Sequence, residues 1–291
     1  MRITGNRLID VSAAATSKNQ SAVADISAQV SSGLRVGTPS DDPAAWIAAQ
    51  RTKLRQAFSQ GTGAAVAASR DRLEVTDNSL GAIGDVLSQI RTLAIQGSSD
   101  TYNADNRAGL GAQVRGLFQS ALDSANVRGT DGEYLLAGTA SLIAPFDAAG
   151  VYRGDAITRS VPSGDAVTDG TTIAGSALTA ASGVDVLPLL DRVATALQNN
   201  DLATLLSTLP DLDTAVKQVS LARTQAGGAM NALDATTSAR TALEASMQQT
   251  ISKLVEADTV TAASELAKAS QSLEVSRAVT SHILAVLDPT K

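Results

Sequence analysis

Two adjacent carboxylates, Asp41 and Asp42, are the residues best suited to chemistry, because they stand between the flexible Gly37 and the rigid Pro43. Such a pair could act in catalysis or bind calcium. An EF-hand calcium loop needs oxygen ligands at alternating positions and a glutamate at the twelfth, and nothing near Asp41 supplies that pattern. The GLRVGTPS segment also lacks the Gly-Lys-Ser/Thr ending of a phosphate-binding loop. We therefore expect the pair to shape the chain.

Other residues that commonly carry catalysis are scarce. The chain has no cysteine, and its one histidine, His282, lies beside Ile283 in a helical pattern. Without cysteine there are no disulfides or thiolates, and one histidine cannot form a histidine-rich metal site. The middle stretch, residues 138–183, contains no His, Cys, Glu or Lys, which argues against a hydrolase there. We expect no enzymatic activity and no cofactor.

The stretch SSGLRVGTPSDDPAAW predicts a helix end, a loop and a new helix start. Gly33 can end the first helix in the left-handed conformation that glycine tolerates, and Pro39 keeps that helix from restarting. Pro43 disfavours helical geometry at the residue before it, so Asp42 is the expected N-cap and Pro43 the first helical residue. The two carboxylates would then lie at the positive end of the new helix.

Composition narrows the class of protein. Only 2% of the 291 residues are aromatic, so burial must come mainly from Ala, Leu, Val and Ile, which favours helices packed in thin layers. The net charge of −6 argues against binding to nucleic acid or to an anionic membrane. No window approaches 18 apolar residues, and residues 1–20 carry Asp10 and Lys18 instead of a hydrophobic signal core. We expect neither a membrane-spanning segment nor a cleavable secretory signal.

Heptad patterns predict long helices packed on other helices. One a/d pattern comprises Val66, Leu73, Leu80, Ile83, Leu87, Ile90 and Ala94. A second comprises Leu110, Val114, Leu117 and Ala121, and the SSDTYNADN segment between the two suits a turn and a new N-cap. Toward the end of the chain, Leu254 and Leu266 are twelve residues apart and not fourteen. We expect a helix crossing residues 258–264 to present different faces on its two sides and so to join two layers.

The middle of the chain differs in kind. Residues 138–183 are rich in Gly, Thr, Ser, Asp and Pro, with short β-favouring runs between turn signals, which predicts a small insertion of β-hairpins. The GEYLLAGT segment predicts a strand flanked by bends at Gly132 and Gly138, because it lacks the spacing of a nucleotide-binding loop. A helical pattern returns at Asp185.

The two terminal helices have weak apolar stripes. These comprise Ile3, Leu8, Val11, Val23, Ile26 and Val30 at one end, and Leu266, Leu273, Ile283 and Leu287 at the other. Each buried Val or Leu contributes only about 1.5 to 3 kcal/mol, so neither helix offsets its own ordering entropy. We expect the two stripes to pair with each other and with neighbouring molecules, as an assembly interface.

Four motifs resemble one family. SSGLRVGTPSDDPAAW resembles the N-terminal signature of the flagellin superfamily, in the SDDP form typical of members that join the flagellar hook to the filament. The matching residues are Gly33, Arg35, Pro39, Ser40, Asp41, Asp42 and Pro43. ANVRGTDGEYLLAGT, the PF and VYRGD segments that follow it, and RTQAGGAMNAL also resemble that family in the same order. The ILAVLDPTK ending departs from the Leu-Leu-Arg finish common in filament flagellins, which favours the junction members.

The resemblance implies a mainly α fold with a small β insertion, built from long antiparallel helices. It implies that residues 1–37 and 256–291 form a coiled-coil assembly domain. Residues 38–137 and 184–255 would form a helical core domain, and residues 138–183 an outward-facing β-rich domain. The terminal helices would form the coiled-coil layer.

The resemblance also implies a structural protein of the bacterial flagellum, exported without a cleavable signal peptide to an extracellular position. Its implied partners are copies of itself in a ring, a hook-side hook-associated protein, flagellin and a flagellar export chaperone. A short filament flagellin is the alternative within the superfamily. A non-flagellar helical adaptor fits the periodicity alone but not the motifs.

Overall fold

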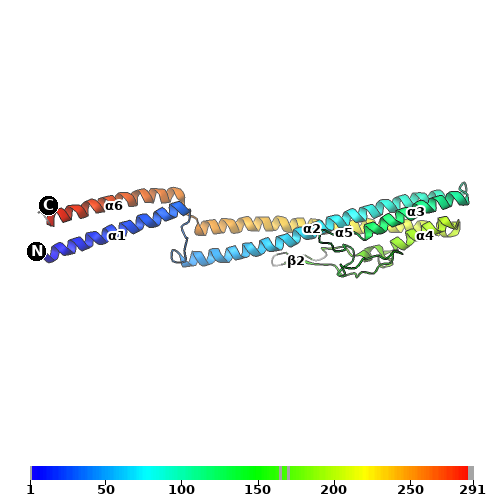
Figure 1. Cartoon of the computed structure of the whole chain (residues 1–291), viewed down its shortest axis with the longest axis horizontal. Helices are drawn as coiled ribbons and strands as arrows, with labels where there is room; N and C mark the ends of the chain where they lie inside the picture. Colours follow the sequence, from blue (N-terminus) through cyan, green and yellow to red (C-terminus); the bar gives the residue numbers. More distant parts are fainter. Residues whose placement is uncertain (1, 164–165, 169–170, 288–291) are drawn as a thin grey trace. The chain divides into compact units, whose positions relative to one another are not determined.

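Helices make up most of the computed structural model, which describes residues 2–163, 166–168 and 171–287 (Figure 1). The side chains of residues 2–6, 163, 166–168 and 287 are not described. The helices are α1 (Arg2–Ser32), α2 (Pro43–Gly97), α3 (Ala104–Ala125), α4 (Val186–Gln198), α5 (Leu202–Val255) and α6 (Thr259–Leu287). The remaining elements are strands β1 (Val161–Ser163) and β2 (Ala166–Thr168) and the 3-10 turns η1 (Gly175–Leu178) and η2 (Ala180–Ser182). The predicted fold class, mainly α with a small β insertion, is confirmed.

The chain forms two compact units. One combines the two ends of the chain, up to Ala57 and from Leu243 onward, and the other comprises Phe58–Ala242. The long helices α2 and α5 each contribute residues to both units. The resemblance implied three domains, which is a finer division than these two units, and it stays a prediction.

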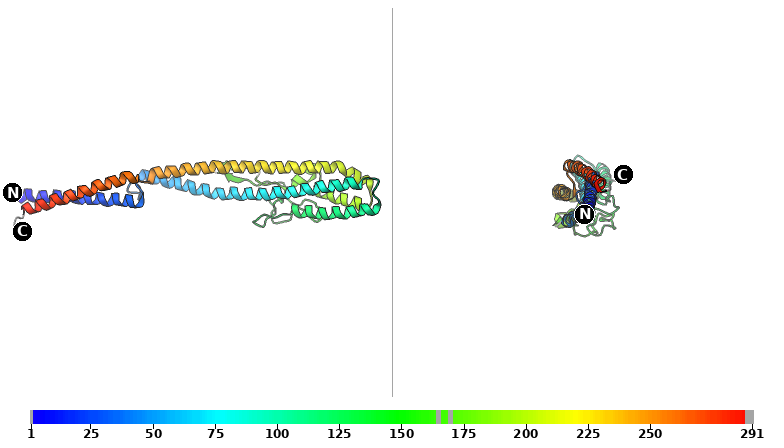
Figure 2. Two further views of the ribbon diagram at one scale, coloured as in Figure 1. Left: turned by 90° about the horizontal axis from the view of Figure 1, so that it is seen from above. Right: turned by 90° about the vertical axis from the view of Figure 1, so that its left-hand side faces the viewer.

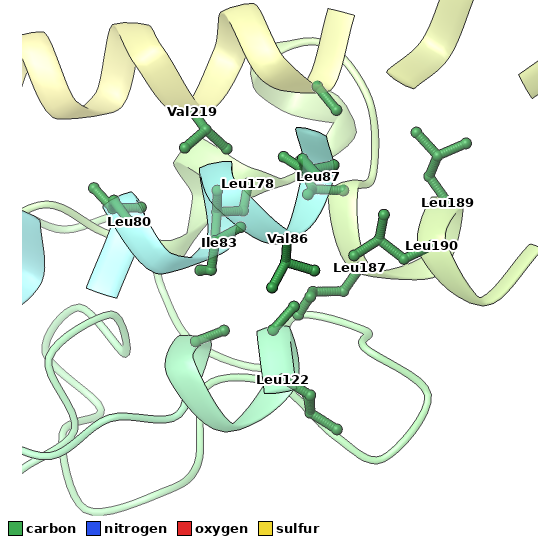
Figure 3. Close-up of a cluster of buried hydrophobic side chains, with 14 of the residues drawn as sticks. Leu80, Ile83, Val86, Leu87, Leu122, Leu178, Leu187, Leu189, Leu190 and Val219 are labelled. Carbon is green, nitrogen blue, oxygen red and sulfur yellow. The ribbon is translucent and has the colours of Figure 1, made fainter. Parts of the chain in front are cut away.

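The Phe58–Ala242 unit has a hydrophobic core of buried aliphatic side chains. The predicted α2 seam is confirmed, because Leu80, Ile83, Leu87 and Ile90 are all 0% exposed. Side chains of α3, α4 and α5 complete the same cluster, among them Leu122, Leu187, Leu190 and Val219 (Figure 3). With about 1.5 to 3 kcal/mol for each fully buried aliphatic side chain, this cluster is what holds the unit together.

A buried arginine, Arg107, links two turns of this unit. Arg107 is only 6% exposed, and no carboxylate accepts a hydrogen bond from its guanidinium. It donates instead to the carbonyl oxygens of Gly97 and Ser99, at 2.8 and 3.0 Å, and to Oδ1 of Asn200 at 2.7 Å. Because Gly97 ends α2, the guanidinium lies at the negative end of that helix dipole. Arg107 therefore joins the α2–α3 turn to the α4–α5 turn.

The predicted N-cap of α3 is confirmed at Asn103, whose side-chain oxygen accepts from the Asn106 N–H at 2.8 Å. The helix expected from Asp185 is also confirmed, since Asp185 is the N-cap residue of α4. In both cases a polar residue just before an apolar repeat marked the helix start.

The prediction that residues 138–183 form several regular β-hairpins is wrong. In the described part of this insertion the only ladder is the antiparallel pair β1–β2, in which Val161 faces Thr168. Side chains satisfy much of the remaining backbone. Asp147 accepts from the N–H groups of Ala149 and Val151, at 3.0 and 2.9 Å, and so closes the turn beside the isolated Phe146–Tyr152 bridge.

The GEYLLAGT segment is likewise not a regular strand. Tyr134 forms one isolated bridge with Arg128, and the Arg128 guanidinium lies over the Tyr134 ring. Gly132 and Gly138 have φ of +79° and +71°, so the predicted glycine bends are confirmed on both sides.

One continuous helix does not cross the change of heptad phase, because α5 ends at Val255 and α6 begins at Thr259. Asp258 starts the new helix, since its carboxylate accepts from the N–H groups of Val260 and Thr261, at 3.0 and 3.2 Å. The change of heptad phase therefore marks a break between α5 and α6, and Asp258 caps the second of these helices.

Candidate assembly surfaces

The segment from Gly33 to Pro43 is a corner at which four helix ends meet. Gly33 has φ of +70° and ends α1, as predicted. Its carbonyl oxygen accepts from the Ala257 N–H at 2.9 Å, which ties the end of α1 to the start of α6. Asp42 caps α2 as predicted, because its Oδ1 accepts from the Ala45 N–H at 3.0 Å.

Arg35 has a role at this corner that the sequence did not reveal. Its guanidinium donates to the Leu254 carbonyl oxygen at 2.8 Å and forms an ion pair with Asp42 at 3.4 Å. The N–H groups of Arg35 and Val36 both donate to the Val255 carbonyl oxygen. These donors satisfy the carbonyl groups left free at the end of α5. The sequence carries no signal for this contact, because the partners are 219 residues apart.

The two carboxylates that first suggested chemistry are both occupied by backbone hydrogen bonds. Asp41 Oδ2 accepts from the N–H groups of Thr38 and Gly37, at 2.7 and 2.9 Å, and these bonds lower the pKa of its carboxyl. The Ala45 N–H, followed by the Arg35 guanidinium, lowers the pKa of the Asp42 carboxyl. These hydrogen bonds favour the ionised form of both carboxylates, which shape the corner.

The loop between these caps is a tight turn. The Asp41 N–H donates to the Thr38 carbonyl oxygen at 3.2 Å, with Pro39 in the second position of the turn. The hydroxyls of Ser40 and Thr38 share a hydrogen bond at 3.2 Å. Pro39 and Ser40 therefore serve the turn itself.

A small core lies under the corner. Val36, Ala45, Ala49, Ile251 and Val255 form a buried cluster. Trp46 packs against this cluster, which confirms its predicted role as a packing anchor. The corner thus has both hydrogen bonds and apolar burial to fix it.

Helices α1 and α6 pair along one seam, side by side in Figures 1 and 2. Half-buried side chains follow heptad spacing in both helices. The residues at that spacing in α1 are Ile9, Ser12, Thr16, Asn19, Val23, Ile26 and Val30, and in α6 they are Leu266, Ala269, Leu273, Ser276, Thr280 and Ile283. Ala22, Gln29 and Ser270 are half-buried beside them, and Ala262 is fully buried. No described side chain of α1 is fully buried.

The predicted stripes match this seam in part. Val23, Ile26 and Val30 lie in it, as do Leu266, Leu273 and Ile283. Leu8 and Val11 do not, because they are 55% and 65% exposed. The side chains of Ile3 and Leu287 lie outside the described ones. The expectation that all ten residues form an assembly interface stays a prediction.

Sequence reasoning passed over the polar members of the seam, Ser12, Thr16 and Asn19, because it searched for apolar residues only. A heptad step back from Val23 and Ile26 lands on Thr16 and Asn19, so the spacing itself was the signal.

A second, unpaired stripe runs along α6. Val275, Val279 and Val286 are 58%, 49% and 65% exposed, and their spacing of four and seven residues places them on one face. His282 is exposed at the intervening heptad position. Together with Leu8 and Val11 these valines form what we call the open apolar surface of the terminal helices.

The Phe58–Ala242 unit has a hollow between α2 and the insertion, of about 420 Å³, with Arg72 and Arg159 in its lining. Both guanidiniums are engaged there: Arg72 with Asp131 and Glu133, and Arg159 with Glu133. Burial opposes ionisation of Glu133, but Arg159 and Arg72 outweigh it and lower the pKa of that carboxyl. The charges in this hollow thus serve to hold the insertion on α2.

The described residues contain no group of three or more His, Cys, Asp or Glu that could hold a metal ion. Nor does any described helix combine the length and apolar character needed to cross a membrane.

Comparison with known proteins identifies relatives. Residues 8–141 match the family model of the bacterial flagellin N-terminal helical region, and residues 209–287 match that of the C-terminal helical region. The chain is 28% identical over 168 residues to flagellar hook-associated protein 3 of Salmonella typhimurium, and 31% over 131 residues to the protein of that name from Escherichia coli.

Those two alignments cover 56% and 44% of this chain, but only 52% and 41% of the relatives. The chain thus spans about half the length of the curated relatives it matches. A solved structure assigned as a flagellar hook-associated protein from Vibrio parahaemolyticus superposes with a TM-score of 0.68 at 21% identity, over 74% of this chain and all of that one. At that identity the likeness shows a common fold.

Proposed function

Because the chain belongs to the bacterial flagellin family, we propose that it is a structural subunit of the flagellum that joins the hook to the filament. The subunit acts by helix packing and carries no chemistry. Its partners are copies of itself in a ring, a hook-side hook-associated protein and flagellin, with an export chaperone before assembly. Export without a cleavable signal peptide to an extracellular position belongs to the same proposal.

The observation that carries this proposal is the open apolar surface of the terminal helices. Val275, Val279 and Val286 on α6, and Leu8 and Val11 on α1, are each about half exposed or more. Covering such a stripe with another helix contributes roughly 25 cal/mol for each Å² of apolar surface buried. A neighbouring subunit would supply that cover, which fits a role for the terminal helices as the assembly domain. Residues 138–183 are the outward domain of the same proposal.

The junction role is favoured over that of a short filament flagellin by two observations. Both curated relatives carry the name hook-associated protein 3. The start of α2 also carries the Asp42–Pro43 pair, and this SDDP sequence resembles the junction members more than filament flagellins.

An epitope inserted after Asp165, between β1 and β2, would test the location. We expect immunogold label in a short collar between hook and filament, and loss of the gene should release unattached flagellin into the medium. Label along the whole filament would establish the flagellin alternative, and label away from flagella would refute both.

Two variants test the assembly surface. Val275→Glu with Val279→Glu should leave the purified chain folded by circular dichroism but prevent its addition to hooks, because two carboxylates would oppose burial of that stripe. Leu142→Glu is the matched control, since Leu142 is 83% exposed but lies in the other unit. Truncation of residues 1–30 or 266–291 should have the same effect as the double variant. Retained assembly of both truncations would contradict the proposal.

A further inference from the structure

The α2 helix carries two heptad stripes on opposite faces. One is the seam that faces α5. The other begins with four exposed residues, Ile47, Arg51, Leu54 and Phe58, which we call the outer stripe. At the same spacing this second stripe continues to Arg72, which pairs with Glu133, and to Ser79, whose hydroxyl donates to the Ser124 carbonyl oxygen at 2.6 Å. The chain therefore covers the later part of the stripe and leaves the outer stripe open.

The outer stripe presents large apolar side chains to solvent. Ile47, Leu54 and Phe58 are 52%, 71% and 61% exposed, and Phe58 is one of only three phenylalanines in the chain. At Gly61, one turn further on, no atom lies within 4 Å of the position that a Cβ would take, so the backbone there is open to close approach. An exposed apolar row of this kind marks a contact surface.

The face of α2 toward α5 is polar at the same level. Gln56 Nε2 donates to Gln248 Oε1 at 3.4 Å, and the Arg240 guanidinium donates to the Ser59 carbonyl oxygen. From residue 50 to residue 65, all of which the structure describes, no apolar side chain of α2 is buried. A helix pair that had to be stable alone would place its apolar residues inside. This part of α2 is therefore suited to burial on its other face.

The outer stripe also lies in the basic part of α2. Residues 43–70 contain Arg51, Lys53, Arg55 and Arg70 and no acidic residue, in a chain of net charge −6. Among the described residues, Arg70 is the only one of the four in an ion pair. The other three are exposed, so a positive charge surrounds the apolar side chains.

Opposite charge gathers beyond the far end of the same helix. Residues 71–242 contain 19 acidic and 11 basic residues. Close to the turns that Arg107 joins, three exposed carboxylates, which form no ion pair among the described residues, accompany two half-exposed aliphatic side chains. We call these five residues the acidic end: Ile95, Asp100, Asp105, Asp201 and Leu206.

The two surfaces are complementary, because each combines apolar side chains with charges of opposite sign. One chain cannot bring its own two surfaces together, since α2 has 55 residues and is about 80 Å long. We propose that the outer stripe binds the acidic end of a second copy, in a contact staggered along α2. Copies side by side at the same level would instead set basic residues against basic residues.

This contact joins two different surfaces, so it can repeat from one copy to the next. The inference deepens the proposed function and rests on it for the assembly of copies. It concerns the assembled subunit, so its test is incorporation into flagella.

Two reversed chains test the contact, each expressed at full length in a strain that lacks the native gene. Arg51→Glu with Arg55→Glu reverses the outer stripe, and Asp100→Lys with Asp105→Lys reverses the acidic end. Either reversal should lower incorporation at least about tenfold, because like charges then face each other. Immunoblots of sheared flagella measure incorporation, and circular dichroism of each purified chain should match that of the native chain.

A rescue experiment identifies the occupant. A chain with all four substitutions should return to within about threefold of native incorporation, and so should coexpression of the two reversed chains, since opposite charges can then meet between copies. An outer stripe that bound flagellin or a hook-side protein would gain nothing from either combination. Failure of both rescues, or normal incorporation of either reversed chain, would overturn the proposal.

Two controls match these variants. Lys217→Glu with Arg153→Glu changes the net charge as much as the stripe reversal, at exposed positions outside both surfaces, and should leave incorporation unchanged. Phe58→Ser should lower incorporation severalfold without moving the midpoint of chemical denaturation, whereas Leu221→Ser, at a residue that is 59% exposed on α5, should change neither.

The location experiment separates this inference from the junction role. Label along the whole filament would refute the junction role alone, because copies of a flagellin could make the same contact. Label in the collar together with two failed rescues would overturn the contact alone.

Discussion

The two helix seams of this protein have the same heptad spacing but differ in what fills it. In the Phe58–Ala242 unit, the α2 seam presents Leu80, Ile83 and Leu87, each 0% exposed. In the α1–α6 pair, no described α1 side chain is fully buried and the middle of the seam is polar. The first seam completes a core within one chain. The second supplies only a defined pairing and leaves apolar side chains such as Val275 and Val279 exposed.

The largest effect should come from Leu87→Ala. A cavity in this closed core should lower the free energy of unfolding of the Phe58–Ala242 unit by about 3 kcal/mol. Chemical denaturation measures the loss, and amide exchange in α1 and α6 should not change. Leu221→Ala is the control, because Leu221 is 59% exposed and should cost less than about 0.5 kcal/mol.

The matched change in the other seam is Leu273→Ala, which should cost only about 1 kcal/mol, because Leu273 is half-buried. The loss should appear as faster amide exchange within α1 and α6. If Leu273→Ala cost as much as Leu87→Ala, the contrast between the two seams would be wrong.

Arg107→Met tests whether the stability of the Phe58–Ala242 unit also depends on the hydrogen bonds that Arg107 donates. The methionine would leave the carbonyl oxygens of Gly97 and Ser99 and the Asn200 side chain without their donor, and we expect a loss of about 2 kcal/mol. Arg107→Lys should not restore stability, because an ammonium cannot reproduce the three-way contact of the planar guanidinium. Thermal unfolding of each variant measures the change, and full stability of the lysine variant would refute the three-way role.

A smaller effect should follow from Asp42→Ala, which removes the cap at the corner. We expect several-fold faster amide exchange in the first turn of α2, and Asp42→Asn should retain most of the protection. The pKa of Asp42 is lowered in the folded chain, so its contribution is present above the ordinary aspartate pKa of about 3.9 and is lost as the pH falls through the lower folded value. Protection that stayed constant down to pH 2 would contradict this account.

The smallest effect concerns alkaline pH. Burial raises the pKa of Tyr152 to about 12, and its hydroxyl donates to the Asp155 carbonyl oxygen at 2.6 Å. A raised pKa favours the protonated form in the fold, so this contribution is complete below about pH 10 and is lost as the pH rises toward 12. All three tyrosines lie in the Phe58–Ala242 unit. Tyr152→Phe should flatten the alkaline part of its stability profile, and an unchanged profile would exclude Tyr152 as the cause.

Much of this arrangement could be predicted from local patterns. Apolar residues at heptad spacing predicted the α2 seam, and Gly33, Asp42 and Asn103 marked helix ends, because a helix terminus is fixed by a few neighbouring residues. The insertion was predicted less well, since its β-favouring runs form isolated bridges such as Phe146–Tyr152, beside turns that side chains such as Asp147 close. The break before α6 was mistaken for a change of face, although Asp258 gave a capping signal.

By itself, the sequence determined where several helices begin or end, which of their faces are apolar and that the chain resembles flagellins. These properties depend on residues close together in the chain. Only the tertiary structure decided that Arg35 caps α5, that Arg107 joins two distant turns, and that Asn19 meets Ser276. Such contacts join residues about 90 to 260 positions apart, and hydrogen bonding at that separation depends on how whole helices are placed, which no local pattern specifies.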